Sequence, residues 1–478
     1  MKYAARGSLL VRLPNLYGRF ALRLVLPVGF VLGLTVLPFC GRAWSEEIAN
    51  SAAAYPTRSA EAPGSAVASQ AIGTGSIAPG LHRGRGITIL QLGDSHTAAD
   101  YFTGEVRQLL QARYGNGGPG FLVLGCPRPH EYHAIIKSSC TSGWIYSSIK
   151  KSDSAPPFSL SGFTASAKAS GESINLSAET VMPYDDIEIG ARAGPEKGAI
   201  EVLVDNVVRL RRSLADQIET PITLSVSASP AGSSSSNITT RPRTRHLREV
   251  SIKVTDSEPV DLSGIGIFNR SAGVSFSNIG FTGATIAVID KFDPGVLASE
   301  LERLAPDLVI IEFGTNEGFH DDTDLAEYRA LFARVIGKIR TALPETRLVM
   351  ILPPDAERLP KNCTAETARA ACSDQPQETD VLGAEPSCVW RKPPKLDPIR
   401  EIERDIAQQE NIPIWDWSKL VPTNCGAHIW SRERHLMTAD HVHFTKEGYK
   451  ASGQQFAKFL FPIVDDIKKH KAAVSARK

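Results

Sequence analysis

The stretch that decides the fold is Ile87-Thr88-Ile89-Leu90-Gln91-Leu92-Gly93-Asp94-Ser95. Its first six residues are mostly apolar, which is typical of a buried strand. A helical pattern follows at once and ends at Gly115. The apolar residues that share one face of this predicted helix are Phe102, Val106, Leu109 and Leu110. In an open α/β sheet, the junction between such a strand and helix presents ligand-facing groups, so we expect Ser95 to be accessible there.

The same alternation of strand and helix returns in the second half of the chain. Strands are predicted at 307–313, 347–352 and 412–415, and helices at 325–343, 399–409 and 448–461. Alternation of this kind predicts a parallel sheet with helices on both faces, which is a three-layer α/β/α fold.

Between these two halves the pattern changes to short strands. Residues 156–269 contain period-two runs separated by Gly, Pro and Ser clusters, such as Ile200-Glu201-Val202-Leu203-Val204. This pattern predicts a β-sandwich inserted into the α/β domain. A smaller insertion, rich in proline and charge, is expected over residues 355–396. The α/β domain would then comprise 86–155 and 270–465, with a basic tail at 466–478.

Residues 1–45 have the composition of a signal peptide. Basic residues precede an apolar run at 24–39, which is shorter than the roughly 20 residues of a spanning helix and contains two prolines. We therefore expect cleavage after Ser45 rather than a retained anchor. Residues 46–85 are rich in Ala, Ser, Gly and Pro and are predicted to be a flexible linker. The mature protein is expected in the periplasm or outside the cell.

The cysteines fit an oxidising compartment. If Cys40 leaves with the signal, an even number remains, which predicts disulfides. Cys126 and Cys140 are the expected local pair, and the other four allow three connectivities: they are Cys363, Cys372, Cys388 and Cys425.

The balance of charge argues against a polyanionic partner. The chain has 53 basic and 52 acidic residues and a net charge of +1. No global field favours nucleic acid or an anionic membrane surface. We expect no nucleic-acid partner, and no membrane span once the signal is removed.

Five residues are suited to nucleophilic catalysis. A serine hydroxyl such as that of Ser95 needs a base, a group that orients the base, and donors for the developing oxyanion. Asp440 and His443 are three residues apart before the last predicted helix, so one turn can present both side chains to the same point. Asn316 could donate an amide N–H, and Gly283 a backbone N–H where glycine permits close approach.

Four short blocks, in this order, resemble those of the SGNH (GDSL-like) hydrolase family. They are Gly93-Asp94-Ser95, Gly283, Gly314-Thr315-Asn316 and Asp440-His441-Val442-His443. The resemblance implies a flavodoxin-like α/β/α sheet, with Ser95 as nucleophile, His443 as base and Asp440 as the acid that orients it. It also implies an oxyanion hole formed by the backbone N–H groups of Ser95 and Gly283 and the amide of Asn316.

Within that family the chain resembles bacterial peptidoglycan O-acetylesterases. The resemblance rests on residues 93–100 and 115–121, and on the position of the insert, where these enzymes carry a carbohydrate-binding-like β-domain. It implies a serine esterase that removes O-acetyl groups from a cell-envelope polysaccharide, peptidoglycan above all, through an acetyl-serine intermediate and without a cofactor. His96, where many members have Leu or Tyr, favours the cell-wall and alginate-acetylation branch.

Several alternatives stay open at this point. The same triad could serve a polysaccharide O-acetyltransferase, or the chain could be a catalytically inert glycan-binding envelope protein. A metal site at Asp440, His441 and His443 is the weaker interpretation, because Gly314-Thr315-Asn316-Glu317 has no histidine where a metallophosphoesterase needs one. We predict no metal. His96 and His441, and the tryptophans Trp415, Trp417 and Trp430, could either pack structurally or contact substrate.

Overall fold

The computed structural model describes residues 85–127, 132–151, 158–228, 245–361, 363–364, 372–373, 388–420 and 424–476. The predicted signal at 1–45 and all but the last residue of the predicted linker at 46–85 lie outside these ranges. No helix in the described ranges combines the length and the apolar character needed to cross a bilayer.

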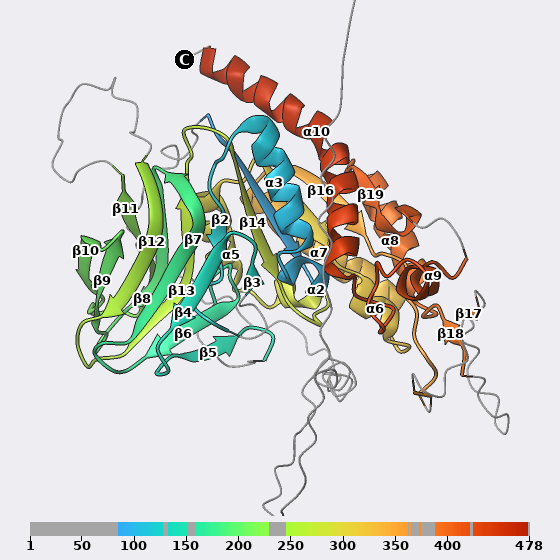
Figure 1. Cartoon of the computed structure of the whole chain (residues 1–478), viewed down its shortest axis with the longest axis horizontal. Helices are drawn as coiled ribbons and strands as arrows, with labels where there is room; N and C mark the ends of the chain where they lie inside the picture. The colour runs from blue at the N-terminus through green and yellow to red at the C-terminus, as the bar shows by residue number, and fades with distance from the viewer. Residues whose placement is uncertain are drawn as a thin grey trace, which may run out of the picture. The chain divides into compact units, whose positions relative to one another are not determined.

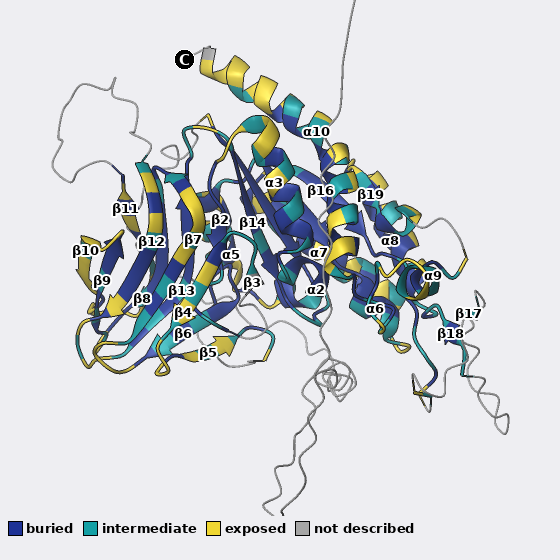
Figure 2. Cartoon of the chain, in the orientation of Figure 1, coloured by how far each residue is buried: buried dark blue, intermediate teal, exposed yellow. Residues whose placement is uncertain are grey.

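A five-stranded parallel sheet is the centre of the α/β domain. In spatial order its strands are β14 (Val274–Gly280), β1 (Ile87–Gly93), β15 (Leu308–Glu312), β16 (Arg347–Leu352) and β19 (Ile414–Asp416). Every residue of β1 is buried, and Figure 2 shows the strands of this sheet dark with burial while the outer helix faces are exposed. The predicted parallel sheet is confirmed.

Helices cover both faces of the sheet (Figure 1). Because successive side chains of a strand point to opposite faces, Ile87 and Ile89 pack in one apolar cluster and Leu90 and Leu92 in another. The first cluster includes α3 (Phe102–Tyr114) and α10 (Lys446–Ala476). The second includes α5 (Pro294–Leu304), α7 (Leu325–Ala342) and α8 (Leu396–Gln409). The result is the predicted three-layer α/β/α arrangement.

The last helix is longer than the predicted 448–461 and includes most of the predicted basic tail at 466–478. Helix α10 continues to Ala476, and Ile467 is buried against the α/β domain at 4% exposure. Lys471 also donates to Asp307 at 2.8 Å. This part of the sequence has one buried isoleucine among several lysines, so it shows no clear apolar helical period.

Two antiparallel sheets lie between β1 and β14 in the chain and enclose an apolar core of their own. One sheet contains, in order, β10 (Val207–Ser213), β9 (Ala199–Val204), β12 (Arg245–Val254), β7 (Ser173–Tyr184), β4 (Ile136–Cys140) and β3 (Tyr132–His133). The other contains β11 (Thr220–Ser227), β8 (Asp186–Ala193), β13 (Val260–Phe268), β6 (Phe163–Ala167) and β5 (Ile145–Ser148), with β2 (Gly120–Leu122) paired to β13.

These two sheets form the insert, but the predicted boundary at residue 156 is too late. The first strand that joins them is β2, which begins at Gly120. Strands β4 and β5 also precede residue 156. Their sequences, IKSSC and IYSS, carry one or two large apolar residues each, so the period-two pattern is too weak to identify them.

Three disulfides join the six predicted cysteines. Cys126 pairs with Cys140, as predicted. Of the three remaining connectivities, the structure has Cys363–Cys388 and Cys372–Cys425. The second of these ties β17 (Cys372–Ser373), inside the 355–396 insertion, to the start of α9 (Gly426–Arg432). Stable disulfides are typical of proteins in the periplasm or outside the cell.

Candidate active site

The topology of the sheet brings the predicted site residues to one edge. Strand β1 lies between β14 and β15, and Gly93 is in register with Gly280 on one side and with Glu312 on the other. Ser95 follows β1, Gly283 follows β14 and Asn316 follows β15. Because parallel strands end at the same edge, the three blocks that carry these residues become neighbours there.

Ser95, His443 and Asp440 form one row of hydrogen-bonded side chains. The Ser95 Oγ lies 2.9 Å from the His443 Nε2, and the His443 Nδ1 lies 2.7 Å from the Asp440 Oδ2. Ser95 is 8% exposed and His443 9%, so both are largely desolvated, and Ser95 is less accessible than expected. The fold thus brings Ser95 into contact with His443, 348 positions further along the chain, and Asp440 lies three positions before that histidine.

The turn that carries Asp440 is organised around this carboxylate. Its Oδ1 accepts from the Thr438 hydroxyl at 2.5 Å and from the backbone N–H groups of Val442 at 2.9 Å and His443 at 3.0 Å. Burial alone would raise the pKa of Asp440, but the hydrogen bond and charge of His443, together with Thr438 and Val442, hold this pKa well below its usual range. Asp440 is therefore a fixed anion beside the imidazole. The contribution of Thr438 was not predicted from the sequence.

Gly283 and Asn316 are the two further candidates for the oxyanion hole. Gly283 has a φ of +65°, in the left-handed region where a side chain is rarely tolerated. The Asn316 Nδ2 donates to the Ala284 carbonyl at 2.9 Å and to the Asp94 Oδ2 at 3.2 Å. Both hydrogens of this amide thus have protein acceptors.

Asp94 ties the serine turn to Asn316. Its carboxylate accepts from the His96 N–H at 2.9 Å and thereby caps α2 (Ser95–Ala98), which is a structural role. Burial raises the pKa of Asp94 to about 6. Three buried glutamates, Glu312, Glu317 and Glu403, lie in the same charge network, and burial raises the pKa of each. No local pattern in the sequence identifies this cluster.

His96 has a structural place in an aromatic cluster. Its Nδ1 lies 3.0 Å from the Tyr449 hydroxyl, and its ring packs beside Trp417 and Phe444. Burial, and then the charge of His443, lowers the pKa of His96 well below its usual range. Trp417 is only 1% exposed in the same cluster, so it packs in the core and does not line an open sugar site.

We expect His96 to make the protein less stable in acid. In the unfolded chain a histidine has a pKa of about 6.5. Below that pH the unfolded chain therefore binds a proton at His96 that the folded protein does not bind. The free energy of unfolding therefore falls as the pH falls from about 6.5 toward the lower folded pKa. In urea denaturation at a series of pH values, His96→Asn should show a shallower loss of stability in acid than the wild type.

The matched control for this experiment is His435→Asn. His435 is exposed and has a φ of +52°, which asparagine tolerates. This variant should keep the wild-type dependence on pH. An unchanged dependence in His96→Asn would contradict the prediction.

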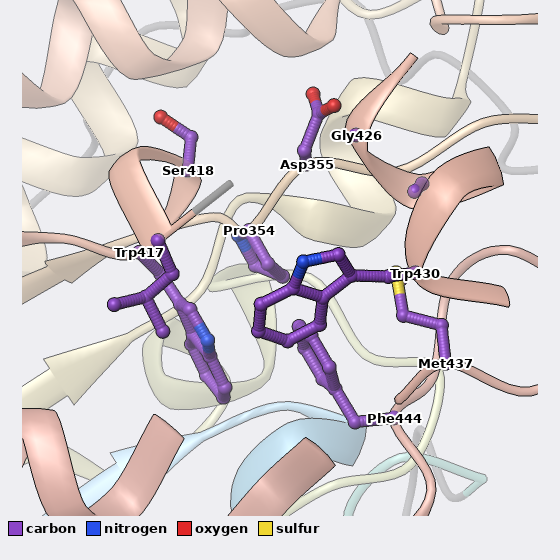
Figure 3. A pocket seen from close by; sticks show the side chains of 10 residues that line it. Pro354, Asp355, Trp417, Ser418, Gly426, Trp430, Met437 and Phe444 are labelled. Atoms are coloured by element: carbon purple, nitrogen blue, oxygen red, sulfur yellow. The ribbon is translucent and has the colours of Figure 1, made fainter. Parts of the chain in front are cut away.

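A small apolar pocket adjoins the turn that carries His443. Figure 3 shows the rings of Trp417, Trp430 and Phe444 around it, with Met437 at one side. Phe444 follows His443 directly and stacks on Trp417, their ring centroids being 5.1 Å apart. The stacking of Phe444 on Trp417 therefore helps to hold the turn that carries His443 in place.

One group of side chains beside this turn could offer three ligands to a metal ion. It consists of Glu357, His428 and His441, whose candidate atoms lie within 4.8 Å of one another. A second combination pairs Glu357 with Cys372 and Cys425, but those two sulfurs form a disulfide. His441 is buried, lies 3.1 Å from Glu357 through its Nδ1 and stacks on Trp390, as expected of a structural histidine. Neither group contains Ser95, Asp440 or His443.

A parallel sheet with a row of hydrogen-bonded Ser, His and Asp side chains at its carboxyl edge is the arrangement expected of a serine-type ester hydrolase. Residues 266–451 match the GDSL-like Lipase/Acylhydrolase family. Over this span, which is less than half of the chain, the protein is similar to the ester hydrolases of that family. The matched span contains Gly283, Asn316, Asp440 and His443, and Ser95 lies ahead of it, on the other side of the insert.

Comparison with solved structures agrees on the fold. A peptidoglycan O-acetylesterase is similar over 80% of this chain and 92% of its own, with 23% identity and a TM-score of 0.60. An acetyl xylan esterase covers 39% of this chain and 82% of its own, with 15% identity and a TM-score of 0.28. A family two carbohydrate esterase from Clostridium thermocellum, in complex with cellohexaose, covers 72% and 99%, with 11% identity and a TM-score of 0.28. These last two similarities are too low to carry an argument. No curated protein sequence matches the chain.

Proposed function

We propose that this protein removes O-acetyl groups from a cell-envelope glycan, peptidoglycan above all, through an acetyl-serine intermediate. The observation that carries the proposal is the 2.9 Å contact between the Ser95 Oγ and the His443 Nε2, with Asp440 on the far side of the imidazole. The similarity in fold to a peptidoglycan O-acetylesterase extends over 80% of the chain, which supports a glycan ester as the substrate class.

The reaction begins when the Ser95 Oγ attacks the acetyl carbonyl carbon and the His443 Nε2 takes the hydroxyl proton. Asp440 stabilises the imidazolium that forms. The tetrahedral intermediate then collapses: the bond to the sugar oxygen breaks, and His443 returns the proton to that oxygen. Water then attacks the acetyl-serine while His443 takes its proton, and the second tetrahedral intermediate collapses. His443 returns this proton to the Ser95 Oγ, and the acetic acid that is released ionises to acetate.

The negative charge on the carbonyl oxygen is stabilised by the backbone N–H groups of Ser95 and Gly283 and by the Asn316 amide. Asn316 must exchange one of its two present acceptors for this oxyanion. The contact to Asp94, at 3.2 Å, is the longer of the two and is the one exchanged. The contact to the Ala284 carbonyl then keeps the amide oriented.

The acyl acceptor distinguishes the esterase from an acetyltransferase with the same residues. Incubated with O-acetylated peptidoglycan and deacetylated glycan oligomers, the protein should release free acetate, with little acetyl transferred to the oligomers. Acetate is measured enzymatically and the oligomers by mass spectrometry. Transfer that exceeds acetate release would assign the transferase instead.

We place this activity in the periplasm or outside the cell, with export directed by residues 1–45. The three disulfides support an oxidising compartment. An O-acetylated envelope glycan would be accessible there.

A further inference from the structure

We propose that Lys150, a residue of the β-insert, orients and polarises the peptide group that supplies the Gly283 N–H to the oxyanion. Lys150 is then a positioning residue for catalysis, and the insert completes the active site of the α/β domain. The proposal rests on the proposed function, because it presupposes the oxyanion role of Gly283.

The contact that carries the proposal joins the insert to the block of Gly283. The Lys150 Nζ donates to the Thr282 carbonyl oxygen at 2.6 Å. The Thr282 carbonyl and the Gly283 N–H belong to the same peptide group, which is planar and trans, so they point in opposite directions. An ammonium that holds the carbonyl on one side therefore fixes the N–H toward the other.

This peptide group needs such a restraint. A glycine has access to more backbone conformations than other residues, and Gly283 has a φ of +65°. Rotation of the peptide would replace the N–H with the carbonyl oxygen, which repels an oxyanion. A hydrogen bond from a charged donor is stronger than one between neutral groups, so Lys150 favours the conformation in which the N–H is available.

The ammonium also acts electrostatically. A cation on the carbonyl polarises the amide, and hydrogen bonds in such a chain strengthen one another. Lys150 lies close to the glycine itself, since a Cβ placed on Gly283 would be 3.1 Å from the Nζ. Its positive charge therefore lies on the far side of the same peptide group, where it makes the Gly283 N–H a stronger donor.

The insert holds Lys150 in place through the turn that follows β5. Lys151 donates its N–H to the Ser148 carbonyl at 3.0 Å, and Ile149 donates to the Gly162 carbonyl at 2.9 Å. Ile149 is 3% exposed and packs in the same apolar cluster as Phe281, the residue before Thr282. The turn thus contacts the segment before Gly283 at two adjacent positions: Ile149 packs in the cluster of Phe281, and Lys150 binds Thr282.

The test compares kcat and KM of full-length Lys150→Met and Lys150→Arg with a small acetyl ester that makes no glycan contacts. Losing a whole oxyanion donor costs about 100- to 1,000-fold in kcat, so a misoriented donor in Lys150→Met should cost roughly 10- to 100-fold with KM nearly unchanged. Lys150→Arg keeps the charge and the donor, and it should recover most of the lost kcat. Lys151→Met, at the exposed neighbour in the same turn, should match the wild type.

A boronic acid that forms a tetrahedral adduct with the serine provides a second measurement. Its affinity should fall in Lys150→Met by about the same factor as kcat/KM, because both depend on the oxyanion donors. If Lys150→Met does not fold, Lys150→Gln replaces it in both measurements, and we expect an intermediate loss from a neutral donor.

A wild-type kcat in Lys150→Met, a loss confined to KM, or an unchanged affinity for the boronic acid would overturn the proposal. If Ser95→Ala is inactive while Lys150→Met has full activity, the proposed function stands and this inference fails. If Ser95→Ala stays active, the proposed function itself fails.

Discussion

Ser95→Ala is expected to lower acetate release from a small acetyl ester by at least about a thousand-fold. The alanine removes the Oγ that lies 2.9 Å from the His443 Nε2, and no acetyl-enzyme can form without it. The residual rate comes from the oxyanion donors and substrate binding, which persist when a nucleophile is deleted. Steady-state kinetics of the purified variant measure the loss, and mass spectrometry should find no acetylated protein.

Ser213→Ala is the matched control for this variant. Ser213 is an exposed serine of β10 in the insert, so its replacement should leave the rate unchanged. Activity above about 1% of wild type in Ser95→Ala would rule out the nucleophile assignment, because loss of a catalytic triad member costs several powers of ten. Such activity would also contradict the inert glycan-binding interpretation, because a group other than Ser95 would then be hydrolysing the ester.

Local patterns explain why much of the α/β domain could be predicted. Strand β1 and helix α3 each carry a clear apolar period over consecutive residues, and the structure has them at Ile87–Gly93 and Phe102–Tyr114. The contact between Ser95 and His443 follows from two short sequence blocks, although 348 positions separate the two residues. Motif order and strand topology together carry that long-range information.

Strand β14 was not predicted, for a reason visible in its neighbours. Its sequence, VSFSNIG, places buried serines between apolar residues. Ser277 is buried because its Oγ accepts from the Phe121 N–H of β2 at 2.8 Å, a strand of the insert. A buried polar residue whose partner comes from another domain looks like a surface residue in sequence. The strand was therefore not distinguished from the β-rich stretch before it.

The contacts of Thr282 and Asn316 beside the proposed oxyanion hole were also not predictable from local sequence. Lys150 lies 132 positions from Thr282, and Asp94 lies 222 from Asn316. Neither pair shares a motif or a period, and a single lysine in a turn is usually a solvated surface residue. The packing of the insert against the sheet edge brings Lys150 to Thr282, whereas the pairing of β1 with β15 brings Asp94 to Asn316.

Asp440→Asn should lower kcat by about a thousand- to ten-thousand-fold with the fold intact, the size of effect seen when a triad aspartate is replaced by its amide. The Asp440 Oδ2 faces the His443 Nδ1 at 2.7 Å, while the Oδ1 accepts from three donors. An asparagine has one oxygen and one NH₂ group. With its oxygen toward those three donors, its NH₂ faces the Nδ1 and favours the tautomer that places the proton on the Nε2, where His443 cannot accept the serine proton.

The opposite amide orientation leaves the NH₂ against the backbone donors of Val442 and His443, which disrupts the turn itself. Both orientations therefore impair the base, and circular dichroism with kinetics on the same preparation separates a lost turn from a wrong tautomer. Thr438→Val is the graded comparison: it removes one neutral donor from the Oδ1 and leaves the Oδ2 contact in place, so its loss should stay within about ten-fold, in line with one hydrogen bond of about 1 kcal/mol. A folded Asp440→Asn protein with more than about a tenth of wild-type kcat would show that the orienting acid lies elsewhere, because replacing a triad aspartate lowers kcat far more than this.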